Sequence, residues 1–237
     1  MADKSRRSRS EAPVCEHLSF AAKEAFKRLR TNLVMSFPEE DSSCHVIGVT
    51  SAQPSDGKST VAINLAYSLA ELGKKVLLID ADMRRPTIHT KAGVEKTPGL
   101  SDLMEGNNAV SSALKEYQSS KDDTVFDVLP GGKTPGNPSE LLNSNRMSSL
   151  LSALSSAYQY IVIDLPPIGA VVDAISVSRY IDGMLVVIRE NNCPRGALAE
   201  CMRQLEYASV NVLGFVVNGA LEGSGKKYQY GSYNYDD

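Results

Sequence analysis

The segment from Ser51 to Thr60 combines residue types that bind phosphate. It ends in Gly57-Lys58-Ser59 and lies between an apolar β-branched run and an amphipathic segment, which predicts a strand, a tight loop and a helix. In that arrangement the loop N–H groups and the positive end of the helix dipole converge on one point. The Lys58 ammonium adds a charge near the β- and γ-phosphates, and the Ser59 hydroxyl can coordinate Mg²⁺. The pattern predicts a nucleoside triphosphate site.

One position departs from the usual pattern, because Ala52 stands where a glycine ordinarily begins the loop. A Gly-Lys-Ser sequence also occurs at ordinary capped helix starts, but the strand before it and the helix after it favour nucleotide binding. We expect Lys58 to be solvated, so that it contributes little to the stability of the core. The residues that we expect to contact the nucleotide are Ser55, Asp56, Gly57, Lys58, Ser59, Thr60 and Asn218.

Three aspartates stand at the ends of apolar runs: Asp80, Asp82 and Asp164. In a parallel sheet the carboxyl ends of the strands meet at the edge that also carries the phosphate loop. An aspartate at a strand end often only caps the next turn, but three of them beside a phosphate loop fit phosphoryl transfer with Mg²⁺. Asp164, after four apolar residues, matches the Walker-B pattern. The expected metal ligands are Ser59, Asp80, Asp82 and Asp164, and the expected catalytic residues are Lys58, Asp80 and Asp82, with Arg84 or Arg85 neutralising charge.

Apolar strands alternate with helical segments along the chain, which predicts a mostly parallel sheet with helices on both faces. The fold class is therefore α/β of the P-loop NTPase type in a single domain. At least six strands are expected, near residues 46–49, 76–79, 125–129, 160–163, 184–188 and 212–217. Helices are expected after the loop and near residues 100–106, 139–154, 171–180 and 195–207. Between residues 85 and 124 the periodicity is weak.

The composition excludes several classes of protein. A formal charge of −3 over 237 residues gives no basic field for nucleic acid. No apolar run approaches the ~20 residues of a membrane-spanning helix, and residues 1–17 lack the apolar core of a signal peptide. The four cysteines lack the spacing of metal ligands, and we assign no catalytic or metal-binding role to them or to the three histidines. We expect a cytoplasmic protein whose basic leader, residues 1–18, is solvated.

The two ends of the chain differ in character. A helix before the first strand carries an apolar stripe, Ala22, Phe26, Leu29 and Leu33, and on another face the charged residues Glu24, Lys27 and Arg30. Residues 223–237 contain no aliphatic residue but four tyrosines within eight positions, Tyr228, Tyr230, Tyr233 and Tyr235. Because such a segment has nothing to pack with, the tyrosines suggest a substrate. The expected organisation is a leader (1–18), a domain (19–222) and a tyrosine tail (223–237).

Taken together, these features resemble the bacterial tyrosine kinases, specifically the cytosolic subunit of capsular and exopolysaccharide systems. The matching segments are the phosphate loop (52–59), Leu77 to Pro86, Pro135 to Leu142, Ile161 to Pro167 and the tyrosine tail. The resemblance covers the chain from about Phe20 to its end.

The resemblance implies autophosphorylation of the tail with ATP and Mg²⁺, with Asp80 as the base and Asp82 and Asp164 around the metal. It also implies a transmembrane activator that recruits the chain to the inner face of the membrane, a tyrosine phosphatase, and a ring-shaped homo-oligomer. In the family the oligomer motif reads Glu-x-x-Arg-x-x-Arg. Here Lys27 stands at the first Arg position, and lysine cannot form the two-pronged contact of arginine.

Two alternatives stay open at this point. A ParA/MinD-like ATPase would use the same fold as an assembly switch, but that family carries a lysine five residues before the loop lysine, where this chain has Gln53. A regulatory module could instead bind nucleotide without transferring phosphate. Labelled phosphate in tyrosine would separate these possibilities.

Overall fold

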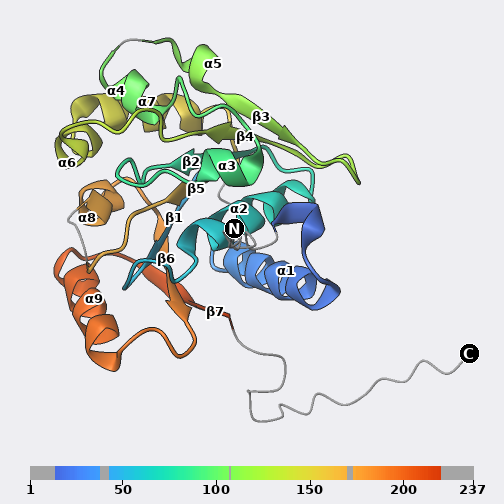
Figure 1. Ribbon diagram of the computed structural model, residues 1–237, viewed down its shortest axis with the longest axis vertical. Coiled ribbons are helices and arrows are strands. Elements are labelled where there is room, and N and C mark those ends of the chain that lie inside the picture. The colour runs from blue at the N-terminus through green and yellow to red at the C-terminus, as the bar shows by residue number, and fades with distance from the viewer. Residues whose placement is uncertain (1–13, 38–42, 107, 170–172, 220–237) are drawn as a thin grey trace, which may run out of the picture.

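The computed structural model describes residues 14–37, 43–106, 108–169 and 173–219 (Figure 1). Its centre is a seven-stranded sheet in the order β3-β4-β2-β5-β1-β6-β7. The pairs β4–β2, β2–β5, β5–β1, β1–β6 and β6–β7 are parallel, and only β3 pairs antiparallel, with β4. The strands are β1 (His45–Ser51), β2 (Val76–Asp80), β3 (Lys115–Gln118), β4 (Val125–Leu129), β5 (Tyr160–Asp164), β6 (Gly183–Arg189) and β7 (Val212–Asn218).

Helices cover both faces because the central strands are apolar on both sides. In β5, Ile161 and Ile163 pack into one buried cluster and Val162 into the other. One cluster includes residues of α1 (Phe20–Met35), α2 (Lys58–Ala70) and α3 (Ile88–Ala92). The other cluster includes α4 (Leu100–Met104), α5 (Val110–Ala113), α6 (Pro138–Leu142), α7 (Asn145–Ser155), α8 (Asp173–Ser178) and α9 (Arg195–Tyr207). The expected α/β fold with a mostly parallel sheet is therefore confirmed.

The structure adds one element to those expected and corrects another. Beyond the minimum of six strands, the sheet has a seventh strand, β3, inside the weakly periodic region; only its Tyr117 is buried, so its sequence carries little alternation. The single helix expected over 139–154 is two helices, α6 and α7. Ser144 separates them, and its side chain accepts a hydrogen bond from the Met147 N–H at the start of α7. An N-cap serine thus starts a new helix inside the segment that was expected to be one helix.

The first helix and the residues before it pack on α2. From the apolar stripe of α1, Leu33 is buried in the same cluster as α2, and Phe26 and Leu29 are partly buried and pack against that cluster. The short helix η1 (Cys15–His17) precedes it, and the Asn64 side chain of α2 accepts a hydrogen bond from the Cys15 N–H at 2.6 Å. Glu16 is buried and accepts from the Tyr117 hydroxyl of β3. The packed part of the chain therefore begins before residue 19.

The parallel order brings the ends of β1, β2 and β5 side by side in the middle of the sheet. Register pairs Asp80 of β2 with Asp164 of β5, and Val49 of β1 with Asp164. The loop that follows β1 therefore starts beside the two strand-end carboxylates. Across the described ranges, no helix has the length and apolar character needed to span a bilayer.

Candidate functional site

The phosphate loop connects β1 to α2 and turns through two left-handed residues. Gly57, directly before α2, has φ +97°, and Ser55 has φ 69°. Alternation of this kind turns successive N–H groups toward one point, which forms a concave anion site. Ala52 is buried and is not among the residues with positive φ, so alanine fits where the usual pattern has glycine.

Side chains from the ends of β6 and β7 brace this loop. The Asn218 amide donates to the Asp56 carbonyl at 2.9 Å, and Arg189 donates to the Ser55 carbonyl at 3.3 Å. The Asp56 carboxylate is fully buried and accepts from the Gln53 N–H and from the Asn192 amide. The Asp56 side chain is thus turned into the protein, so that only its backbone can take part in the expected nucleotide contact. Sequence reasoning missed Asn192 because no motif marks it.

Lys58 is buried at the start of α2. Its ammonium lies 2.7 Å from Asp82 Oδ2 and 3.6 Å from Asp164 Oδ1, and it donates to the Ser59 hydroxyl at 3.3 Å. Burial alone would lower the pKa of Lys58, but the carboxylates of Asp164 and Asp82 outweigh it and hold the pKa above its usual value. The expectation of a solvated lysine was therefore wrong, because this ammonium is the counter-ion of a buried acidic group.

Asp80 and Asp164 lie fully buried on neighbouring strands. Burial, and then the negative charge of Asp164, raise the pKa of Asp80 well above its usual range. Burial also raises the pKa of Asp164, against the opposing effect of Lys58. One oxygen of Asp80 accepts from the N–H groups of Thr87 and Ile88. Among the described residues, the other Asp80 oxygen and both Asp164 oxygens accept no hydrogen bond.

These unsatisfied oxygens fit a divalent cation. Buried carboxylate oxygens without donors are costly unless a cation or water approaches them. The donor set, carboxylates with the Ser59 hydroxyl alongside, has the hard oxygen chemistry of Mg²⁺. Within the described ranges, no three acidic, histidine or cysteine side chains form a complete metal cage. Mg²⁺ does not need one, since it usually takes one or two carboxylates together with water and phosphate.

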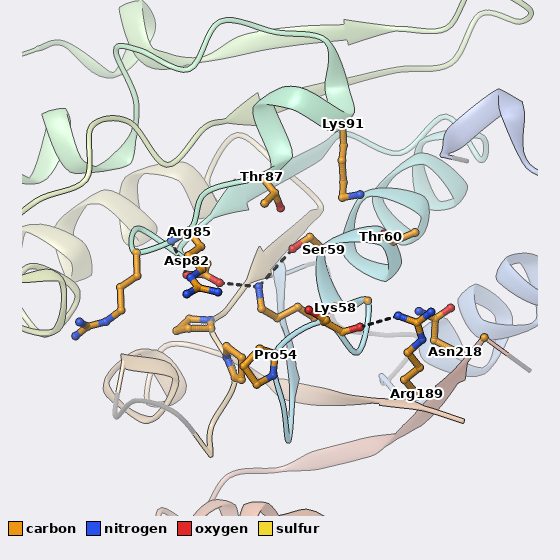
Figure 2. A pocket seen from close by; sticks show the side chains of 16 residues that line it. Pro54, Lys58, Ser59, Thr60, Asp82, Arg85, Thr87, Lys91, Arg189 and Asn218 are labelled. Carbon is orange, nitrogen blue, oxygen red and sulfur yellow. Dashed lines mark hydrogen bonds and ion pairs between the residues drawn. The ribbon is translucent and has the colours of Figure 1, made fainter. Parts of the chain in front are cut away.

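A cavity of about 690 Å³ opens above the loop (Figure 2). Lys58 lies in its middle, Asp82 and Arg85 on one side, and Arg189 and Asn218 on the other. Asp80, Asp164 and Asp56 do not line it. The remaining lining residues are Pro54, Ser55, Gly57, Ser59, Thr60, Arg84, Thr87, Lys91, Pro166, Pro167 and Gly219. Of the three strand-end aspartates, only Asp82 reaches the cavity wall.

The two arginines after Asp82 have different environments. Arg84 donates from Nε to Asp173 at 2.7 Å and from Nη2 to Ser139 at 3.2 Å, so α6 and α8 hold its guanidinium. Arg85 is exposed, and its N–H donates to Asp82 Oδ1 at 3.1 Å. Lys91, which sequence reasoning missed, reaches the cavity from α3. Lys91 was missed because α3 lies in the region where the sequence shows little periodicity, so no helix was expected there.

The expected oligomer residues lie on α1, away from the cavity. Glu24 and Lys27 form an ion pair of 2.8 Å on the helix surface. Arg30 instead reaches α2, where it donates to the Ser68 carbonyl at 2.6 Å and lies 3.4 Å from Glu71. The four tail tyrosines and residues 1–13 of the basic leader fall outside the described residues.

Comparisons with known proteins place this arrangement among kinases. The family model described as AAA domain matches residues 44–206. The chain is 36% identical over 214 residues to the tyrosine-protein kinase YwqD of Bacillus subtilis, covering 90% of this chain and 87% of that protein. It is 37% identical to the putative tyrosine-protein kinase EpsB of Ralstonia solanacearum, covering 88% of this chain but only 27% of that longer protein. The kinase domain of Escherichia coli tyrosine kinase ETK superposes with a TM-score of 0.79 at 32% identity, covering 95% of this chain and 89% of that one.

The brace on the phosphate loop gives a first prediction. A Cβ at Gly57 would lie 1.9 Å from the Asn218 amide nitrogen, in a backbone conformation that L-residues avoid. Gly57→Ala should therefore displace the loop and weaken nucleotide binding about tenfold or more, which corresponds to ~1.4 kcal/mol. Isothermal titration with ADP measures the change.

Gly93→Ala is the matched control, because Gly93 also has positive φ but a Cβ there meets nothing within 4 Å. It should lower stability by about 1–2 kcal/mol and leave nucleotide affinity unchanged. Equal affinity of the Gly57→Ala variant and the parent chain would contradict the proposed brace.

Lys58 gives a second prediction. Lys58→Met removes the cation that contacts Asp82 and Asp164, so the free energy of unfolding should fall by about 3–5 kcal/mol near neutral pH. Without Lys58 the pKa of Asp164 rises further. The folded state then binds protons that the unfolded state releases, and stability falls as pH rises from the ordinary range of an aspartate toward the raised pKa. The deficit should therefore grow as pH rises above that ordinary range and level off above the raised pKa.

Urea unfolding at several pH values tests this expectation. Lys133→Met, which removes an exposed lysine outside the cavity, serves as the control and should change little. A Lys58→Met chain as stable as the parent at pH 8 would show that the carboxylates do not depend on Lys58.

Proposed function

The chain belongs to the bacterial tyrosine kinases, and we propose that it transfers the γ-phosphate of ATP to the tyrosines of its own C-terminal tail. Its relation to kinases at 36% identity over 90% of the chain decides against an ATPase that acts only as an assembly switch. The observation that carries the proposal is that the cavity is lined by Asn218 and Gly219, the last described residues. Only residues 220–222 separate Gly219 from the tyrosine tail in the sequence.

The residues of the cavity divide the reaction among them. Loop N–H groups and Lys58 hold the β- and γ-phosphates. Ser59, Asp80 and Asp164 would hold Mg²⁺, which supplies positive charge to the phosphate oxygens. The tyrosine oxygen forms a bond to the γ-phosphorus while the bond from that phosphorus to the β–γ bridging oxygen breaks. The phenol proton passes to a carboxylate, and the products are ADP and phosphotyrosine.

We assign the proton acceptor to Asp82 in preference to Asp80. A general base must lie within hydrogen-bond reach of the hydroxyl that it deprotonates. Asp82 lines the cavity, whereas the Asp80 side chain is fully enclosed and accepts hydrogen bonds from the Thr87 and Ile88 backbone. Asp80 then serves the metal together with Asp164.

We propose that transfer occurs in trans, from one chain to the tail of a neighbour. Asn218, five positions before the tail in the sequence, lies on one side of the cavity, while the acceptor tyrosine has to reach Asp82 on the other side. Tyr228 lies nine positions beyond Gly219 and spans at most ~30 Å from it, so either site is within reach. In a ring joined through the charged face of α1, Glu24, Lys27 and Arg30, a neighbour's cavity is the more direct target.

The names of relatives also support a proposal for the biological setting. One relative of Klebsiella pneumoniae is named as a putative tyrosine-protein kinase in the cps region. We propose that this chain regulates capsular or exopolysaccharide synthesis or export from the cytoplasm. A transmembrane activator recruits it to the membrane and completes its nucleotide site, and a tyrosine phosphatase removes the phosphates from the tail tyrosines.

Mixing two complementary variants, neither of which can label its own tail, tests transfer in trans. One chain carries Lys58→Met and keeps its tyrosines, and the other keeps its active site but has Phe at residues 228, 230, 233 and 235. Incubated with labelled ATP, Mg²⁺ and the cytosolic segment of the activator, the Lys58→Met chain should become labelled. Circular dichroism verifies its fold, and Asp164→Asn provides a second inactive chain. An unlabelled acceptor in both mixtures would refute transfer in trans.

Phosphorylation should also control assembly. Each phosphate adds about −1.5 to −2 charges, so four add roughly −6 to −8 beside Asp236 and Asp237. Tails gathered in a ring then repel one another, and this repulsion weakens as salt shortens the Debye length. Light scattering should report an oligomer for the dephosphorylated chain and smaller species after phosphorylation, most clearly at low salt. An oligomer of the same size in both states would refute the model.

A further inference from the structure

We propose that Arg85 and Lys91 form an acceptor subsite that selects tyrosines followed by acidic residues. This inference rests on the proposed function and adds the determinant of substrate choice. Its starting point is the division of the cavity by Lys58 (Figure 2). The carboxylates lie on the side of β2 and β5, so the transferred phosphate faces that side, and the acceptor tyrosine has to enter along it.

The wall on that side carries three cations, of which one already has strong partners. Arg84 is held by Asp173 and Ser139, with its Nε–H donating to a carboxylate that is almost completely buried. Within the described residues, the side chains of Arg85 and Lys91 form no ion pair or hydrogen bond, although both line the cavity. They come from different elements, the loop after β2 and helix α3, and together flank Thr87. Two uncompensated cations at the entrance attract an anionic group.

The tail offers tyrosines with opposite charge contexts. Tyr235 is followed directly by Asp236 and Asp237, and Tyr233 lies close before the same pair. Tyr228 follows Lys226 and Lys227. A cationic entrance favours the first context and disfavours the second, because opposite charges attract and like charges repel across the subsite. Tyr235 and Tyr233 should therefore be phosphorylated before Tyr228.

The nucleotide is the other anion that could use these cations, and a mutant cycle separates the two uses. The first variant carries Arg85→Gln and Lys91→Gln, the second carries Asp236→Asn and Asp237→Asn, and the third combines all four changes. At saturating ATP and early times, mass spectrometry gives the ratio of phosphate on residues 233 and 235 to phosphate on residue 228. Lys133→Gln, an exposed lysine outside the cavity, is the control for charge.

The ratio should fall about two- to fivefold in the first variant, as expected for partly exposed ion pairs. It should fall equally in the second variant and no further in the third, because both changes break the same interaction. Lys133→Gln should leave the ratio unchanged.

Two results would overturn the subsite. One is an unchanged ratio in the first variant, whether or not its KM for ATP is raised. The other is that the losses of the first and second variants multiply in the combined variant. If the first variant does not fold, each single substitution should shift the ratio in the same direction, and an unchanged ratio in both would also overturn it. A parent chain that labels no tyrosine would instead refute the proposed function itself.

Discussion

The site depends on one buried charge, the Lys58 ammonium among the carboxylates at the ends of β2 and β5. An isolated carboxylate in this environment would be strongly destabilised, and the parallel register places Asp80 and Asp164 side by side. The positive charge of Lys58 offsets part of the repulsion among these carboxylates, since its ammonium lies 2.7 Å from Asp82 and 3.6 Å from Asp164. Lys58 is also the first residue of α2, the helix whose start forms part of the proposed nucleotide site. Chemistry and stability therefore draw on the same group, and a substitution here changes both.

The cavity has two sides with different tasks. Arg189 and Asn218, at the ends of β6 and β7, and Asn192, in the turn after β6, hold the phosphate loop through hydrogen bonds. Asp82 and Arg85 lie on the opposite side of the cavity, and Lys91 reaches it from α3. Asn218 braces the loop and lies five positions before the tyrosine tail in the sequence. The proposed substrate segment is therefore close in sequence to a residue that holds the phosphate loop.

The parts of the structure with strong local signals were predictable from sequence. The strand ending at Asp164 is a continuous apolar run, which predicts a buried strand. Gly57-Lys58-Ser59 after a strand is typical of a phosphate loop at the start of a helix, so the sheet and the loop could both be predicted. The seventh strand was missed because only Tyr117 of β3 is buried. The burial of Lys58, the inward turn of Asp56 and the capture of Arg84 by Asp173 depend on contacts between residues distant in sequence. No pattern in a single sequence encodes those contacts.

The central claim is that this chain transfers phosphate to its own tail tyrosines, and residue-level mapping of phosphate tests it most directly. The purified chain is incubated with ATP, Mg²⁺ and the cytosolic segment of its activator, then digested and analysed by mass spectrometry. The account predicts phosphate on Tyr228, Tyr230, Tyr233 and Tyr235 and none on Tyr67, Tyr117 or Tyr160, which are buried. Release of ADP without phosphotyrosine would contradict it and would indicate an ATPase.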